Sequence, residues 1–392
     1  MKLFKFCKHW IFPLFIFLIW LGIVCQIKGI YHTHCQWDFR AHYYAAKAYR
    51  QGLNAYALDD VNRVNETGIT IPAPHFFSYN PLILRFDSLL TWIPYPYALT
   101  LINGFYFLLV AVMIFIFSWG FLGRPLQLGI LLLAPFFFNL TIPTCLAAGQ
   151  SAMLESLVIW CAFGAVTTGR TKTFLALIAG LSLLKMVPIV LTLTILLLPD
   201  REKNKKWLAA TWAIFGILYF SPLVWAPTDF QNFLRLDKTL LGEMGMNNPS
   251  SFAFFHDCSQ KLLHLELESR IFSIPTLGYL AWVVIVVTMA WRAIRRMTWE
   301  RDARYMMMLL LVSYALLAPR FKNYTYVELV PIAAWASFYE PLLLPFLLLG
   351  MIFPFLHIGG YFLNAYHPLM ALLALWMVLL RGSSTDLINK TR

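Results

Sequence analysis

An aspartate and a histidine one helical turn apart, Asp38 and His42, are the side chains of this sequence best placed for acid–base chemistry. Hydrophobic periodicity predicts a helix over residues 36–51, and its aromatic and basic character is typical of the headgroup layer of a bilayer. A carboxylate at that depth is partly desolvated, which makes it a better base. Asp38 is therefore the candidate general base, and His42 either competes with it or orients it. The structural alternative is that Asp38 stabilises the positive end of the helix dipole.

The predicted helix is amphipathic. Its apolar face carries Trp37, Ala41, Tyr44 and Ala48. Three basic residues are expected on the sides that face water: Arg40, Lys47 and Arg50. We expect His42 and Tyr44 to contact the substrate.

Other polar side chains are candidates for binding a sugar or a phosphate. Tyr79 and Asn80 end an aromatic segment, where a ring and an amide could bind a sugar; the alternative is an interfacial aromatic belt. Gln150 precedes a predicted helix, whose free N–H groups attract phosphate, although it could instead be a helix cap. Asn248 and His256 are weaker candidates for sugar contacts.

Four charged residues lie within or beside hydrophobic runs. Glu155 is costly in lipid and should face the interior of a helix bundle. Lys185 needs an anionic partner, either Glu155 or a lipid phosphate. Arg320 and Lys322 lie on the predicted outer edge, against the usual charge bias, and are candidates for binding phosphate; the alternative is that they reach out to headgroups.

Composition identifies the kind of protein that must position these groups. The chain has 392 residues, of which 60% are hydrophobic and only 13% are charged, so it is an integral membrane protein. The net charge of +12 is spread over short loops between hydrophobic runs, which argues against a nucleic-acid partner. The six cysteines have no metal-ligand spacing, and Cys35 and Cys258 could pair on the outer side.

The hydrophobic runs predict a single all-α polytopic membrane domain over residues 1–392 with about 10–12 transmembrane helices. The predicted spans are 10–27, 98–121, 126–143, 151–168, 207–225, 273–291, 304–318, 326–339, 341–357 and 361–380. Residues 173–198 are predicted to form a hairpin of two half-helices broken near Lys185 and Pro188. A single span there would place the basic clusters at 170–172 and 201–206 on opposite sides of the membrane.

The distribution of charge predicts the topology. The first run follows Lys2, Lys5 and Lys8 and lacks a cleavage site, so we expect a retained first span and cytoplasmic termini. The expected outer segments are 28–97, 144–150, 226–272 and 319–325, with the candidate catalytic helix in the first. Because the longest polar segments lie outside, we expect the site to face the periplasm or exterior from a plasma (inner) membrane.

Four motifs, taken in order, resemble glycosyltransferase family 87, a group of GT-C-type membrane enzymes. They are WDFRAHYYAAKAYRQGLNAY, FSYNPL, AAGQSAMLES and AGLSLLKMVPIVL, within residues 10–200. The residues that carry the resemblance are Asp38, Tyr43, Tyr44, Gly52, Tyr56, Tyr79, Pro81, Gly149, Gln150, Lys185 and Pro188.

The resemblance implies a GT-C-type bundle that transfers a mannose-like hexose or a pentose, with inversion, from a polyprenyl-phosphate donor to a lipid or glycan hydroxyl. Asp38 would be the general base, and neither a metal nor another cofactor is expected. We expect Arg320, Lys322 and Lys185 to offset charge on the departing phosphate. Two alternatives remain open: a glycan polymerase or ligase that uses a diphosphate-linked oligosaccharide, and a transporter of a lipid-linked substrate.

Overall fold

The structure is a computed structural model that describes residues 36–71, 77–121, 130, 132–199, 201–240, 243–262, 273–356 and 360–381. Within these ranges it consists of α-helices and short 3-10 helices, with no strand. The predicted first span 10–27, Cys35 with its suggested pairing to Cys258, and part of the span 126–143 lie outside the described residues.

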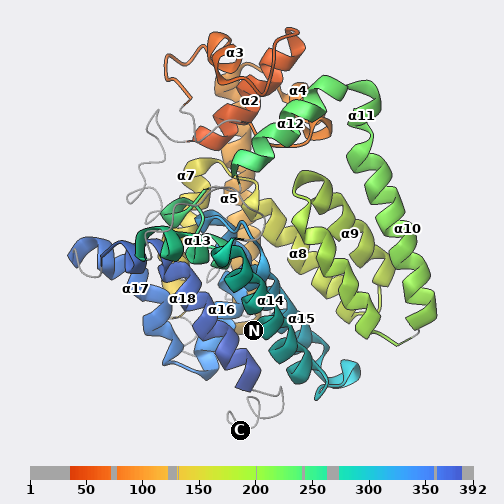
Figure 1. Ribbon diagram of the computed structural model, residues 1–392, viewed down its shortest axis with the longest axis vertical. Helices are drawn as coiled ribbons and strands as arrows, with labels where there is room; N and C mark the ends of the chain where they lie inside the picture. Colours follow the sequence, from red (N-terminus) through yellow and green to blue (C-terminus); the bar gives the residue numbers. More distant parts are fainter. Residues whose placement is uncertain are drawn as a thin grey trace, which may run out of the picture.

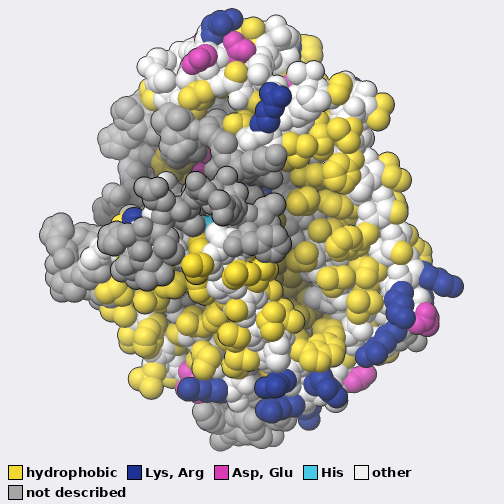
Figure 2. All heavy atoms as spheres, viewed as in Figure 1, with side chains coloured by type: hydrophobic (Ala, Val, Ile, Leu, Met, Phe, Trp, Pro, Cys, Tyr) yellow, Lys and Arg dark blue, Asp and Glu magenta, His cyan; other side chains and the backbone are white. Residues whose placement is uncertain are grey.

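Long apolar helices identify the protein as membrane-embedded. Four described helices are long and apolar enough to cross a membrane: α5 (Tyr95–Phe121), α10 (Arg201–Phe220) with its extension α11 (Pro222–Trp225), α14 (Ile274–Ile294) and α18 (Gly360–Arg381). In Figure 2 hydrophobic side chains cover most of the described surface between the top of the molecule and its lower edge, along which Lys and Arg gather. Exposed apolar side chains on α10 and α14, such as Ile217 and Val284, would be unfavourable in water and suit contact with lipid.

A group of short helices closes one end of the molecule, at the top of Figure 1. We call this group the cap: α2 (Trp37–Arg50), α3 (Leu58–Arg63), α4 (Pro81–Leu90), α11 and α12 (Pro227–Leu240). The predicted helix 36–51 is thus confirmed, and Ala41, Tyr44 and Ala48 are buried as expected. The expected exposure of Arg40 is wrong: Arg40 is buried near Tyr95, because α2 packs against neighbours on more than one side.

The predicted spans 126–143 and 151–168 form a bent pair. A short 3-10 helix η2 (Ala134–Phe136) leads into α7 (Phe137–Ala148), which turns by 114° into α8 (Ala152–Thr167). Residues 144–150, expected as an outer segment between two spans, are mostly helical, because α7 continues to Ala148. Only residues 149–151 form the turn between the two helices, and this turn contributes to the site.

The predicted broken hairpin is confirmed. Helix α9 (Thr171–Leu184) stops at Lys185, and the 3-10 helix η3 (Val187–Leu197) packs back against it. Lys172, at the start of α9, lies 4.3 Å from the ring centroid of Trp207 near the start of α10. The two ends of the hairpin therefore lie at the same end of the bundle, as the positions of the basic clusters required.

The remaining elements complete the bundle and its loops. They are η4 (Gly245–Asn247), α13 (Ser251–Leu262), α15 (Trp299–Leu317), η5 (Asn323–Leu329), α16 (Val330–Tyr339) and α17 (Leu343–Leu356). Residues 226–272, predicted as an outer loop, are largely helical where the structure describes them. Helix α7 packs between η5, α17 and α18, so the bent pair lies inside the bundle rather than at its edge.

Candidate functional site

A cavity of about 300 Å³ lies where the cap meets the bundle. Its walls come from α2, the segment before α4, the α7–α8 turn, the hairpin tip and the loop before η5. The predicted site residues that line it are Asp38, His42, Tyr79, Asn80, Gln150, Lys185, Arg320 and Lys322. Segments far apart in the sequence therefore bring most of the candidate polar groups to one place.

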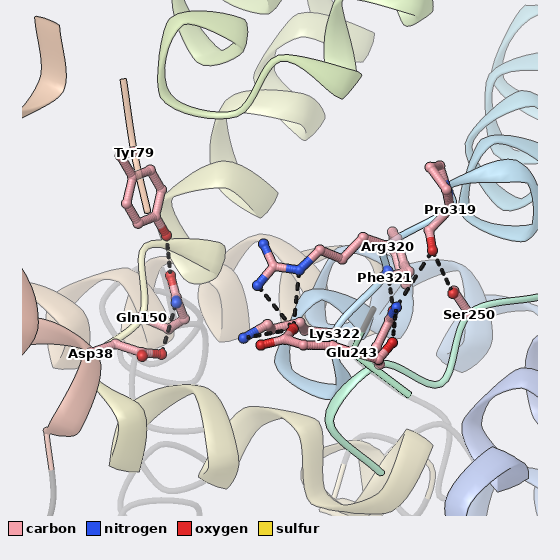
Figure 3. A network of polar contacts seen from close by, with 10 residues as sticks. Asp38, Tyr79, Gln150, Glu243, Ser250, Pro319, Arg320, Phe321 and Lys322 are labelled. Atoms are coloured by element: carbon pink, nitrogen blue, oxygen red, sulfur yellow. Dashed lines mark hydrogen bonds and ion pairs between the residues drawn. The ribbon is translucent and has the colours of Figure 1, made fainter. Parts of the chain in front are cut away.

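Asp38 is held by Gln150. The Gln150 Nε2 donates a hydrogen bond to Asp38 Oδ2 at 2.8 Å, and the Tyr79 hydroxyl donates to Gln150 Oε1 at 3.3 Å (Figure 3). The backbone N–H of Ser151 also donates to this Oε1, at 2.9 Å. Because two donors converge on the amide oxygen, the amide nitrogen must point toward Asp38. The half-buried carboxylate is thereby fixed in direction while it faces the cavity.

The start of α2 packs closely against the α7–α8 turn at Gly149. Gly149 ends α7 with a φ of 67°, in the left-handed region that favours glycine. A Cβ at this position would clash with the side chain of Gln36 and lie 2.9 Å from Cβ of Phe39. Gln36 in turn donates through Nε2 to the Leu146 carbonyl at 2.7 Å. The glycine therefore lets the start of α2, with Asp38, come close to Gln150.

His42 pairs with an aspartate that sequence reasoning missed. Its Nδ1 lies 2.7 Å from Oδ2 of Asp87 on α4, and its ring packs 4.5 Å from that of Tyr79. Asp87 is the only acidic residue of the apolar helix PLILRFDSLL. A single acidic residue in an otherwise apolar helix was the signal in the sequence that could have drawn attention to Asp87.

Lys185 pairs with Glu155, one of the two anionic partners considered for it from the sequence. The Lys185 Nζ lies 2.9 Å from Glu155 Oε2, and the Ser151 hydroxyl donates to Glu155 Oε1 at 2.6 Å. Glu155 is buried, whereas Lys185 keeps 26% of its side chain exposed. Glu328 of η5 is also buried at the cavity, and its Oε2 has no hydrogen-bond partner among the described residues. The floor of the cavity therefore carries two carboxylates and one lysine.

Arg320 and Lys322 share one carboxylate. Arg320 donates through Nε and Nη2 to Glu243 Oε2 at 3.1 and 3.0 Å, and Lys322 Nζ lies 3.3 Å from the same oxygen (Figure 3). Burial, with a smaller effect of Arg320, lowers the pKa of Lys322. Glu243 was not predicted, although the excess of cations on this edge called for an acidic partner. Two cations against one carboxylate leave a positive site for a further anion.

An aromatic ring joins this cation pair to the hairpin tip. Lys185 and Lys322 lie 5.7 and 5.9 Å from the ring centroid of Tyr324. The cavity therefore holds three cations, from the hairpin and from the loop before η5, and two of them lie near the same aromatic side chain.

Three predicted site residues lie outside the cavity lining. Tyr44 is buried against Tyr43 and Tyr95. Asn248 is also buried; its amide nitrogen donates to the Glu243 carbonyl, and its oxygen accepts from the Phe321 N–H at 2.9 Å. It therefore holds Glu243 beside the loop that carries Arg320.

His256, the third of these residues, packs on Phe252 in α13, where burial lowers its pKa. Asn80 lines the cavity, but both ends of its amide bond the protein: Oδ1 caps α4, and Nδ2 donates to the Tyr219 carbonyl.

An apolar groove continues from the cavity. It has a volume of about 790 Å³ and lies between η3 and the helices α14 and α15. Val187, Tyr314 and Pro319 line both the groove and the cavity, so the two are adjacent. A chain of apolar atoms in the groove would thus lead directly to the polar groups.

Comparison of the chain with protein-family models, with curated protein sequences and with solved structures finds no match.

Proposed function

We propose that this protein is a membrane glycosyltransferase of the GT-C type, as the resemblance to family 87 implies. It would move a mannose-like hexose or a pentose from a polyprenyl-phosphate donor to a hydroxyl of a lipid or glycan acceptor. The observation that carries the proposal is one cavity in which an oriented carboxylate, Asp38, and a cation cluster, Arg320 and Lys322, are both present. Displacement of a phosphate by a hydroxyl needs a base that takes the hydroxyl proton and cations that stabilise the departing phosphate. The cavity contains both kinds of group.

The proposed reaction is a single displacement. Asp38 takes the proton of the acceptor hydroxyl as its oxygen bonds to the anomeric carbon. The bond from that carbon to the phosphate oxygen breaks, and its electron pair stays on the polyprenyl phosphate. Arg320 and Lys322 offset the charge that develops there, so Glu243 must share or release them when the donor binds. Attack opposite the leaving group inverts the anomeric carbon.

The apolar groove supports a lipid-linked donor over a soluble sugar nucleotide. Its lining is mostly aliphatic and aromatic along η3, α14 and α15, and it borders the cavity at Pro319 beside Arg320. A phosphate on Arg320 would therefore have an apolar channel beside it for the prenyl chain. Burial of such a chain is favourable by roughly 0.8 kcal/mol for each CH₂.

The test is transfer of label from a polyprenyl-phosphate sugar to membrane extract by the purified protein. We expect Asp38→Asn to lower the rate by about 10²–10⁴-fold, because the amide cannot accept the proton. The matched control is Asp59→Asn, an exposed aspartate on α3, which should transfer at the normal rate. Near-normal transfer by the Asp38 variant would remove Asp38 from the mechanism.

The same assay separates the rival functions. A transporter is favoured by the broken element α9–η3 and by the Lys185–Glu155 ion pair that joins its tip to α8, and it would move a lipid-linked substrate between leaflets without forming a new glycoside. A polymerase or ligase would consume only a diphosphate-linked oligosaccharide. Absence of transfer from every monophosphate donor, with either of these activities present, would overturn the proposed function.

A further inference from the structure

A second acid–base group lies beside Asp38 on the cavity wall. His42 is one helical turn along α2 from Asp38, and both side chains line the cavity. His42 is also paired across helices, since its Nδ1 lies 2.7 Å from Asp87 Oδ2. The two side chains are 16% and 18% exposed, so the pair is largely enclosed but still reaches water.

The aspartate fixes the tautomer of the histidine. An ionised carboxylate only accepts hydrogen bonds, so the Nδ1 of His42 must carry the hydrogen. In the neutral ring the lone pair then lies on Nε2, which is the atom able to take up a proton. The negative charge of Asp87 also stabilises the imidazolium ion once it has formed. An imidazole with a carboxylate behind it is an arrangement that recurs where histidine acts as a base.

Packing connects His42 to the network that holds Asp38. The His42 ring contacts Tyr79 at a centroid distance of 4.5 Å and Phe77 at 5.2 Å, edge-on to the latter. The hydroxyl of Tyr79 donates to Gln150, which donates to Asp38. His42 therefore lies on the same wall of the cavity as Asp38, the candidate base.

We propose that His42 is a second acid–base residue of this site, which receives the proton that Asp38 removes from the acceptor, and that Asp87 is its positioning residue. This inference rests on the proposed function. After each transfer Asp38 holds the acceptor proton and must lose it before the next turnover. Transfer of that proton to the free Nε2 of a neutral imidazole leaves Asp38 ionised and ready for the next acceptor. The proton then passes from His42 to water at the exposed edge of the pair, and no other reactant is needed.

The experiment compares initial rates of sugar transfer by the full-length protein carrying His42→Gln, Asp87→Asn or Asp59→Asn. Glutamine fills much of the same space and forms hydrogen bonds but cannot take up a proton. We expect His42→Gln to lower turnover by about 10²-fold with little change in KM. Asp87→Asn should lower turnover by roughly 10-fold, and Asp87→Glu should recover part of the loss because it restores the charge. Asp59→Asn should behave as the wild type.

Two further measurements distinguish chemistry from structure. Thermal unfolding and binding of polyprenyl phosphate should be unchanged in His42→Gln, and added imidazole should restore part of the activity of His42→Gly. Turnover by His42→Gln within about threefold of wild type, loss of polyprenyl-phosphate binding, or absence of rescue by imidazole would each overturn the assignment. Absence of transfer by the wild-type protein from every monophosphate donor, with transport or ligase activity present, would instead overturn the proposed function, so the two failures differ.

Discussion

At the scale of single residues, the orientation of Asp38 depends on Gln150. Its amide donates to Asp38 and accepts from Tyr79 and Ser151, and it is buried. We expect Gln150→Leu to lower transfer by about 10–100-fold, which corresponds to the roughly 1.5–3 kcal/mol of a hydrogen bond to a charged group. The measurement is turnover with the polyprenyl-phosphate donor at saturation. Gln51→Leu, at an exposed glutamine just after α2, is the control, and equal activity of the two variants would contradict the role of Gln150.

The lowered pKa of Lys322 predicts how donor binding depends on pH. Burial favours the neutral amine, so Lys322 loses its positive charge at a lower pH than an exposed lysine does. Binding of polyprenyl phosphate should therefore begin to weaken at a pH below the range in which an ordinary lysine loses its charge, by at most about tenfold per pH unit. Lys322→Arg stays charged over this range and should show a flatter profile. Parallel profiles for the two proteins, measured as Kd for polyprenyl phosphate, would exclude Lys322 from the anion site.

Residue type and position predicted several of the polar groups that line the cavity. Five residues stood out because each is a polar group at a membrane depth where contact with lipid is energetically unfavourable: Asp38, Gln150, Lys185, Arg320 and Lys322. Asp87 and Glu243 did not, since an acid in a loop or on an amphipathic helix usually faces water. Their partners are set by how α4 packs on α2 and by how Asn248 holds the 243–248 segment beside Phe321. The isolated acid of α4 and the excess of cations near Glu243 were signals that an acidic group matters there, but one sequence does not show which side chains such packing brings together.

At the scale of elements, the Lys185–Glu155 pair joins the hairpin tip to α8. Glu155 is 1% exposed, so removing only one partner leaves an uncompensated charge. We expect Lys185→Met or Glu155→Gln to reduce stability by about 3–5 kcal/mol, and the double variant to recover most of it. Thermal unfolding in detergent measures the effect. The matched control is Lys205→Met with Glu202→Gln, an exposed pair on α10, for which each change should cost less than about 1 kcal/mol. Additive losses in the buried pair would contradict this coupling.

Elements differed in how well the sequence predicted them. The break in α9–η3 followed from a conflict of charge, because Lys172 and the 201–206 cluster had to share a side. The bend between α7 and α8 had no comparable signal. Before it, Phe138, Asn139 and Leu140 adopt positive φ angles, which apolar side chains rarely do, so neither composition nor hydropathy predicted an interrupted helix there. The helices of the 226–272 segment were missed because its polar residues resemble those of a loop.

At the scale of the whole molecule, charge and hydrophobic surface predict the orientation in the membrane. Exposed basic residues gather at the end of the bundle opposite the cap: Arg201, Lys203, Lys205, Lys206, Arg292, Arg295, Arg296, Arg301 and Arg304. The positive-inside rule assigns that end to the cytoplasm, and the cap with the cavity then faces the periplasm or exterior. A polyprenyl-phosphate sugar presented on the outer leaflet would meet Arg320 and Lys322 from that side.

Labelling of single cysteines by a membrane-impermeant maleimide in intact cells tests this orientation. Asp59→Cys on the cap and Lys203→Cys at the basic end are both exposed positions, and the native cysteines would be replaced by serine. We expect the cysteine at position 59 to react in intact cells, and the one at position 203 to react only after the membrane is opened. The opposite pattern would place the cavity in the cytoplasm. Asp38 would then face nucleotide-activated sugars as well, and the preference for a polyprenyl-phosphate donor would lose its topological support.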